Sequence, residues 1–227
     1  MLAQFPQPDS DACRAVAAAC DAEAAVVVRA RVRATLPLVL FAAWRAAGRL
    51  GPRRWIPAGG AHPRGVVGHL LAALELAGQC ADPPDAIVAP LGSGGTVAGL
   101  VLGVAALGWP TPVIAVRVAP RVIANRWRIT RLARGAARLL AHYGVHIPPP
   151  ASHSPLVVVN GLGPGYGRPT PAGESARHLA AEHGLTLDPT YSAKAFAVLG
   201  QRAAGNVRRV VFWHTFALPS RASEPGS

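Results

Sequence analysis

The sequence predicts an α/β protein built on an open, mostly parallel β-sheet with helices on both faces. Two observations support this fold class. Short, largely apolar runs such as Ala86–Ala89 and Val113–Val118 alternate with longer helical segments, and the glycine-rich stretch Gly92–Gly95 follows the first run closely. Strands that are apolar along their whole length are typical of parallel sheets covered on both faces. A chain of 227 residues that is 51% hydrophobic can also bury a substantial core.

Each element is assigned from the period of its apolar residues and from the Gly and Pro residues that interrupt them. Before the glycine stretch, we expect a helix capped by Asp9 or Ser10 and running to about Cys20, a strand at Ala25–Val28, a helix at Leu36–Ala47, and a loop at Trp55–His69 leading into a helix through Leu70–Leu76. After it, we expect a helix at Thr96–Leu107, the strand Val113–Val118, an amphipathic helix at Val122–Tyr143, a strand at Leu156–Val159, a loop at Gly161–Arg168, helices at Ala172–His183 and Tyr191–Ala203, and a strand at Val207–Trp213.

The glycine stretch lies between a strand and the start of a helix, where it can bind an anion. Free backbone N–H groups and the positive end of the helix dipole converge at such a position, which suits a phosphate group. The hydroxyls of Ser93 and Thr96 can add donors. Val97 stands where a dinucleotide fingerprint has its third glycine, and no Gly-Lys ending of a P-loop follows. A tight, purely structural turn is the alternative interpretation.

The net charge of +12 raises the question of nucleic-acid binding, because clustered basic side chains neutralise phosphates. The arginines are scattered, without interleaved aromatic residues or a recognition motif. Specific nucleic-acid binding is therefore not favoured, although it stays as an alternative. The eight histidines and three cysteines show no metal-ligand spacing, so we expect no metal site.

The uncharged segment Ala86–Val116 is long enough to suggest a membrane span. Glycines and prolines divide it into strand, loop and helix lengths, so we expect no span. The N-terminal residues show no basic region followed by an apolar one, as a secretory signal would, and the odd number of cysteines fits a reducing compartment. These features favour a cytoplasmic location.

Five motifs occur in a fixed order along the chain: IPAGGAHPRGVVGH, PPDAIVAPLGSGGTVAGL, GPGYGRPTPAG, LDPTYSAKAF and VVFWHT. Together they resemble the D-cysteine desulfhydrase and 1-aminocyclopropane-1-carboxylate deaminase family of pyridoxal-phosphate enzymes. The resemblance implies the tryptophan-synthase-β-like fold, known as fold type II, with pyridoxal 5'-phosphate as the cofactor and small amino acids as substrates. It divides the chain into a remnant of the small domain at residues 1–54, a large cofactor-binding domain at 55–219, and a tail at 220–227.

The resemblance also assigns individual site residues. Tyr166 and Tyr191 match the two active-site tyrosines of the family, which can take part in proton transfer. Thr215 is our first choice and Ser192 our second for the hydroxyl partner of the cofactor's pyridine nitrogen, and a hydroxyl there slightly favours desulfhydrase over deaminase chemistry. The residues that match the phosphate-binding loop of the family are Gly92, Ser93, Gly94, Gly95 and Thr96.

The lysine that binds the cofactor covalently in this family lies in a GGNK-like segment followed by Ser-Asn-His, and neither occurs in this sequence. Lys194 is the only lysine. The family has a lysine at this position that is not the covalent one, so we expect Lys194 to lie on the surface or in helix packing. Further departures from the family pattern are His62, Arg64 and His69 in the first motif, and Phe216 and Ala217 after the last.

We therefore expect a truncated or N-terminally divergent family member whose small domain is incomplete and whose activity alone is doubtful. Its expected partners are a second copy of the chain or a complementary small-domain piece. The first alternative is a non-catalytic protein that binds pyridoxal phosphate or another phosphate ligand. The second is a basic protein that associates with nucleic acid.

Overall fold

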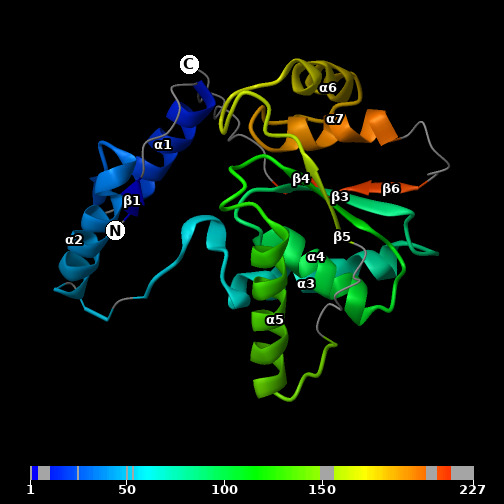
Figure 1. Ribbon diagram of the computed structural model, residues 1–227, viewed down its shortest axis with the longest axis horizontal. Helices are drawn as coiled ribbons and strands as arrows, with labels where there is room; N and C mark the ends of the chain where they lie inside the picture. The colour runs from blue at the N-terminus through cyan, green and yellow to red at the C-terminus, as the bar shows by residue number, and fades with distance from the viewer. Residues whose placement is uncertain are drawn as a thin grey trace, which may run out of the picture. The chain divides into compact units, whose positions relative to one another are not determined.

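The computed structural model describes residues 2–4, 11–24, 26–49, 51–52, 54–148, 156–202 and 209–215. The chain divides into two compact units, the first formed by Met1–Trp55 with Leu218–Ser227 and the second by Ile56–Ala217. Each unit contains its own parallel sheet, of two strands in the first and four in the second (Figure 1).

The first unit is a small β-α-β arrangement followed by a second helix. Its strands pair in parallel, and the side chains of Gln4 and Arg29 on the two strands interact with each other and with Asp21 on the helix between them. The strand at the start of the chain was not predicted, since three residues carry too little periodicity to indicate one. Capping by Asp9 or Ser10 lies outside the described residues. The elements are β1 (Leu2–Gln4), α1 (Asp11–Glu23), β2 (Val27–Arg29), the 3-10 turn η1 (Arg33–Thr35) and α2 (Leu36–Gly48).

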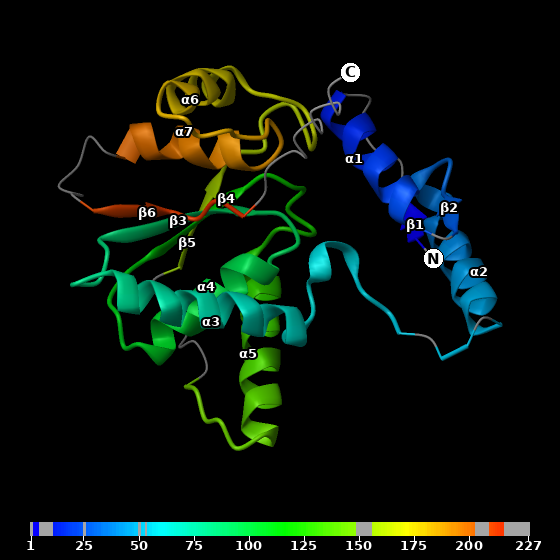
Figure 2. The same cartoon turned by 180° about the vertical axis from the view of Figure 1, so that it is seen from behind.

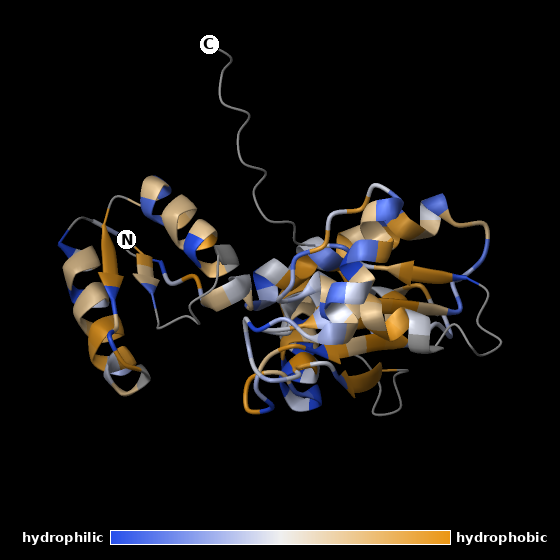
Figure 3. Ribbon diagram, turned by 90° about the horizontal axis from the view of Figure 1, so that it is seen from above, coloured by the Kyte–Doolittle hydropathy of each residue, from blue (hydrophilic) through white to orange (hydrophobic). Residues whose placement is uncertain are grey.

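The second unit contains a four-stranded, fully parallel sheet with the strand order β5-β4-β3-β6. Its strands have the apolar runs expected of a sheet covered on both faces, and they are orange along most of their length in Figure 3. The strands are β3 (Ala86–Leu91), β4 (Val113–Arg117), β5 (Leu156–Asn160) and β6 (Val210–Phe212). The helical elements are the 3-10 turn η2 (Ala58–Gly60), α3 (Pro63–Gln79), α4 (Gly95–Ala106), α5 (Arg126–His142), α6 (Pro171–Glu182) and α7 (Ser192–Arg202).

Helices cover both faces of this sheet. Helices α3, α4 and α5 pack on one face and α6 and α7 on the other, as Figures 1 and 2 show from opposite sides. Alternate residues of β3 point to opposite faces: Ile87, Ala89 and Leu91 belong to the core under α3–α5, whereas Ala86 and Val88 belong to the core under α7. The predicted fold class is confirmed.

Two helix starts differ from the sequence prediction because capping residues set them. Helix α3 begins at Pro63 rather than near Leu70, since the His62 side chain accepts a hydrogen bond from the Arg64 N–H and proline favours the first helical position. Helix α5 begins at Arg126 rather than Val122, because the Asn125 side chain accepts from the Arg128 N–H at 2.9 Å. Among the described residues, no helix is both long and apolar enough to cross a bilayer.

Candidate functional site

The sheet of the second unit has one topological switch point, between β3 and β6. The connections from β3 to β4 and on to β5 run through α4 and α5 on one face, and the return to β6 runs through α6 and α7 on the other. In open α/β sheets, ligands bind outside the carboxyl ends of the strands at such a point. Two predicted site segments, the loop Gly92–Thr96 after β3 and Thr215 after β6, follow the two strands concerned.

The Gly92–Thr96 segment forms a tight turn that opens α4. Gly94 is the N-cap in a left-handed conformation with φ of 93°, and no side-chain cap bonds the first N–H groups of the helix. Those groups have no partner inside the helix, so they are available to an anion. The turn η2 packs closely against this loop: a Cβ atom on Gly59 would lie 2.4 Å from the Ser93 Oγ. A side chain at position 59 would overlap the Ser93 hydroxyl, so glycine at this position lets the turn η2 lie close to the Gly92–Thr96 loop.

Two side chains missed by the sequence analysis hold this loop. Arg128, at the start of α5, donates from Nε to the Ser93 carbonyl oxygen at 2.8 Å and brings a positive charge to the loop. His69 on α3 lies with Nε2 3.1 Å from the Thr96 Oγ1. Burial lowers the pKa of His69, which favours the neutral ring. The Thr96 hydroxyl, a predicted donor to phosphate, therefore has a neutral partner within the protein.

The structure brings the two predicted tyrosines together. The hydroxyls of Tyr166 and Tyr191 form a hydrogen bond, and their rings meet edge to face with centroids 5.9 Å apart. Tyr191 also lies against the glycine loop, since a Cβ atom on Gly92 would be 3.2 Å from its ring. Both phenols and the glycine loop thus belong to one site at the carboxyl edge of the sheet.

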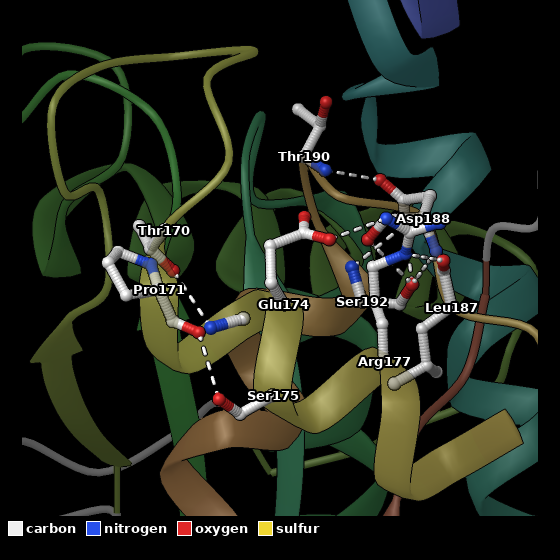
Figure 4. Close-up of polar contacts among 10 residues, drawn as sticks. Thr170, Pro171, Glu174, Ser175, Arg177, Leu187, Asp188, Thr190 and Ser192 are labelled. Carbon is white, nitrogen blue, oxygen red and sulfur yellow. Dashed lines mark hydrogen bonds and ion pairs between the residues drawn. The ribbon is translucent and has the colours of Figure 1, made fainter. Parts of the chain in front are cut away.

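The buried carboxylate of Asp188 organises the start of α7 (Figure 4). Asp188 is 1% exposed and accepts hydrogen bonds from the backbone N–H groups of Thr190, Tyr191 and Ser192 at 2.7 to 2.8 Å. The Ser192 hydroxyl donates to the same carboxylate at 2.6 Å. Ser192, our second choice for the pyridine nitrogen, is therefore already bonded within this network.

Lys194 is buried in the second unit, with 2% of its surface exposed. Its Nζ donates to the backbone carbonyl oxygens of Leu162 and Gly165, at 2.9 and 3.1 Å. Burial lowers the pKa of Lys194, and the nearby Asp188 carboxylate acts in the opposite direction. Lys194 reaches from α7 to the loop that carries Tyr166, so the surface location, one of the two expected for it, is wrong.

Thr215 lies beyond the carboxyl end of β6 and is exposed. Parallel pairing aligns Phe212 with Val88, and the Trp213 N–H donates to the Val88 carbonyl oxygen at 2.8 Å. Thr215 comes three residues after Phe212, as the end of β3 at Leu91 comes three residues after Val88. Thr215 therefore lies at the same edge of the sheet as the glycine loop. Phe216 and Ala217 lie outside the described residues.

The pyridoxal-phosphate dependent enzyme family matches residues 40–215. The chain belongs to this family. It is 33% identical to a candidate 1-aminocyclopropane-1-carboxylate deaminase of Thermotoga maritima over 166 residues, covering 70% of this chain and 50% of that protein. It is also 33% identical to a D-cysteine desulfhydrase of Salmonella paratyphi C over 175 residues, covering 73% and 50%. The chain thus spans about half the length of these curated relatives.

Solved structures support the same membership. The crystal structure of an ACC deaminase homologue matches with a TM-score of 0.74 and 25% identity, over 93% of this chain and 63% of that one. An O-ureido-L-serine synthase structure, at 16% identity and a TM-score of 0.57, shows the shared fold. The predicted family and the fold type II architecture are therefore confirmed.

Proposed function

We propose that this chain forms the phosphate-binding and tyrosine-bearing part of a pyridoxal-phosphate-dependent desulfhydrase or deaminase that acts on small amino acids. The observation that carries the proposal is the meeting of the Gly92–Thr96 loop with Tyr191 and Tyr166 at the switch point of the sheet. Relatives named for D-cysteine desulfhydrase and aminocyclopropane-carboxylate deaminase activity match the same stretch of chain. In this proposal residues 55–219 are the large cofactor-binding domain.

The residues of the loop fit the phosphate of the cofactor. The backbone N–H groups that begin α4 point out of the helix without intrahelical partners, and Gly94 has the left-handed φ that such a turn requires. Gly59 leaves the space beside Ser93 open, where any side chain would overlap its hydroxyl. Arg128 adds a positive charge through its bond to the Ser93 carbonyl oxygen. We assign phosphate binding to Gly92, Ser93, Gly94, Gly95 and Thr96.

The remaining site residues have separate roles. When bound, pyridoxal phosphate supplies an electron sink for a carbanion. Thr215 is the proposed hydroxyl partner of the pyridine nitrogen, because the Ser192 hydroxyl is already bonded to Asp188. The phenols of Tyr166 and Tyr191 share a hydrogen bond, so a proton can pass between them and a bound amino acid.

A second candidate function is reversible, non-catalytic binding of pyridoxal phosphate, and one observation favours it. Lys194 is the only lysine of the sequence, and its ammonium group is buried on two backbone carbonyl oxygens. An amine held in this way is not free to bond covalently to a cofactor. Catalysis then depends on a lysine from outside residues 1–227, and we propose a complementary small-domain piece or a second copy of the chain as the partner.

Titration of the purified chain with pyridoxal phosphate tests the proposal. We expect saturable binding that inorganic phosphate displaces, because the loop recognises the phosphate group. After borohydride reduction and mass spectrometry, we expect no adduct on Lys194. Sulfide release from D-cysteine and ammonia release from aminocyclopropane-carboxylate report activity, and both are expected to require a lysine from outside residues 1–227.

Several results would contradict the proposal. Absence of binding that phosphate displaces would exclude the cofactor cradle altogether. A borohydride-trapped adduct on Lys194 would support an enzyme that uses this lysine and would exclude the non-covalent candidate. Salt-sensitive retention of nucleic acid without cofactor binding would instead favour the basic, nucleic-acid-associating alternative.

A further inference from the structure

The burial of the only lysine has a structural consequence for the loop 161–168, which follows β5. Lys194 Nζ reaches this loop from α7, across a separation of about thirty residues in sequence, and bonds to the carbonyl oxygens of Leu162 and Gly165. These two residues precede Tyr166 closely, and Gly165 is its direct neighbour. The side chain that fixes the path of the backbone into Tyr166 is therefore Lys194.

The loop needs such an anchor because its own residues restrict it little. Gly163, Gly165 and Gly167 have positive φ values of 62°, 154° and 74°. Glycine reaches these conformations without strain but also leaves the unbound chain many alternatives, so the folded path costs conformational entropy. The Gly161 N–H bonds the Arg117 carbonyl oxygen at 2.9 Å and ties the loop at its start. Lys194 ties it across its middle.

The same helix positions the other tyrosine by different means. Tyr191 directly precedes α7, and its backbone N–H donates to the Asp188 carboxylate at 2.7 Å. Asp188 and Lys194 are buried on α7 or just before it, and their opposite charges favour each other. The start of α7 thus supplies one anchor for Tyr191 and another for the loop of Tyr166.

We propose that Lys194 is a positioning residue that holds Tyr166 against Tyr191 through the carbonyl oxygens of Leu162 and Gly165. Asp188 provides the negative charge that keeps the buried ammonium group in place. The role of the tyrosine pair in proton transfer rests on the proposed function, whereas the positioning does not. The pair stays assembled whether or not cofactor binds.

Nitration of tyrosines with tetranitromethane tests this inference on the full chain without cofactor. The sequence has three tyrosines, and Tyr143, at 71% exposed, serves as an internal reference. In the wild-type chain, we expect Tyr166 and Tyr191 to react more slowly than Tyr143. In Lys194→Met, we expect the Tyr166 rate, relative to Tyr143, to rise about tenfold because the loop opens locally. The Tyr191 rate should change much less, since Asp188 still holds its backbone.

Two further variants separate positioning from general destabilisation. Lys194→Arg keeps a charged donor group and should restore protection of Tyr166, whereas Lys194→Leu, which has no donor and is used if the Met variant does not fold, should expose it. Circular dichroism identifies the folded variants. An unchanged Tyr166 rate in a folded Met or Leu variant would overturn the inference, as would equal increases at Tyr166 and Tyr191. Cofactor titration of the same variants is scored separately, so a failure of cofactor binding leaves this result intact.

Discussion

The two glycine-containing loops at the carboxyl edge of the sheet are held in different ways. The turn of the Gly92–Thr96 loop is set by its own backbone, with the left-handed Gly94 placed directly before helix α4, and Arg128 and His69 contact it from other helices. The loop 161–168 takes its position from Lys194, a side chain that lies 29 to 32 residues away from the carbonyl oxygens it binds. The first loop has a turn defined by its own glycine and the helix that follows, whereas the second is bound at its middle by a buried ammonium group.

The difference shows how a site can survive changes in its surroundings. A local turn with free N–H groups needs only glycine and a following helix, so its capacity to bind an anion follows from a short stretch of sequence. A loop fixed by a buried charge needs the whole packing of α7, because an ionised side chain is stable in the interior only when its partners are in place. Variants of the two loops should therefore fail in different ways.

The largest effect is expected from Asp188→Asn, which removes the negative charge beside the buried Lys194 that holds the loop 161–168. The amide has one oxygen where the carboxylate accepts four hydrogen bonds, and it removes the charge that faces Lys194. We expect the free energy of unfolding to fall by about 2–4 kcal/mol, measured by urea denaturation. Asp82→Asn is the matched control, since Asp82 is 73% exposed and pairs with Arg209 at 3.4 Å.

The control should lose less than about 1 kcal/mol, as exposed ion pairs do. Similar losses in the two aspartate variants would mean that the buried network at the start of α7 adds no stability beyond that of a surface pair. The proposed dependence of the loop 161–168 on a buried charge would then be contradicted.

The local loop is tested by Gly94→Ala, with Gly108→Ala as the control. Both glycines have positive φ, 93° and 64°, at opposite ends of α4, and an added Cβ meets only ordinary contacts or open space. Backbone strain should lower the stability of both by about 1–2 kcal/mol. Only Gly94→Ala should also misalign the N–H groups, which we expect to weaken phosphate-displaceable cofactor binding about tenfold to a hundredfold. Equal affinities in the two variants would contradict the assignment of the cradle.

A smaller effect is expected from pH through His69, which contacts the local loop. Burial lowers its folded pKa below the ordinary value near 6.5, so the unfolded chain binds more protons between these two pKa values. The free energy of unfolding should therefore fall as pH decreases below about 6.5, by at most about 1.4 kcal/mol per pH unit for one proton. His69→Gln should reduce this slope in urea denaturation at several pH values, while His178→Gln, at an exposed position, should leave it unchanged.

Much of the fold could be predicted from the sequence because its signals are local. The strand Ala86–Leu91 is apolar throughout and Val113–Arg117 is apolar up to its last residue, and glycines and prolines lie near their ends. The starts of α3 and α5 were misplaced because His62 and Asn125 act as caps only in the folded backbone. A capping residue is one of many polar residues until the helix that it caps exists.

The site residues likewise divide into those with a local sequence signal and those whose contacts join distant segments. The Gly92–Thr96 loop was found from its glycines and its place between strand and helix, before any resemblance was needed. Tyr166 and Tyr191 required the resemblance, since no pattern of spacing brings them together. Arg128 and His69 were missed as supports of the loop, because their contacts join segments 27 to 35 residues apart. Such contacts depend on packing that a single sequence does not display.

The smallest effect is expected from Glu174→Gln, which tests whether the region before α7 owes its order to surface charge. Glu174 and Arg177 form a half-exposed pair at 2.8 Å on α6, and the Arg177 Nε also donates to the Leu187 carbonyl oxygen, next to Asp188. The neutral glutamine leaves the bond to Leu187 available, so we expect a loss of only about 0.3–0.5 kcal/mol in urea denaturation. Nitration of Tyr166 and Tyr191 should stay at the wild-type rate. A loss comparable to that of Asp188→Asn would show that the surface pair, and not the buried carboxylate, holds the start of α7.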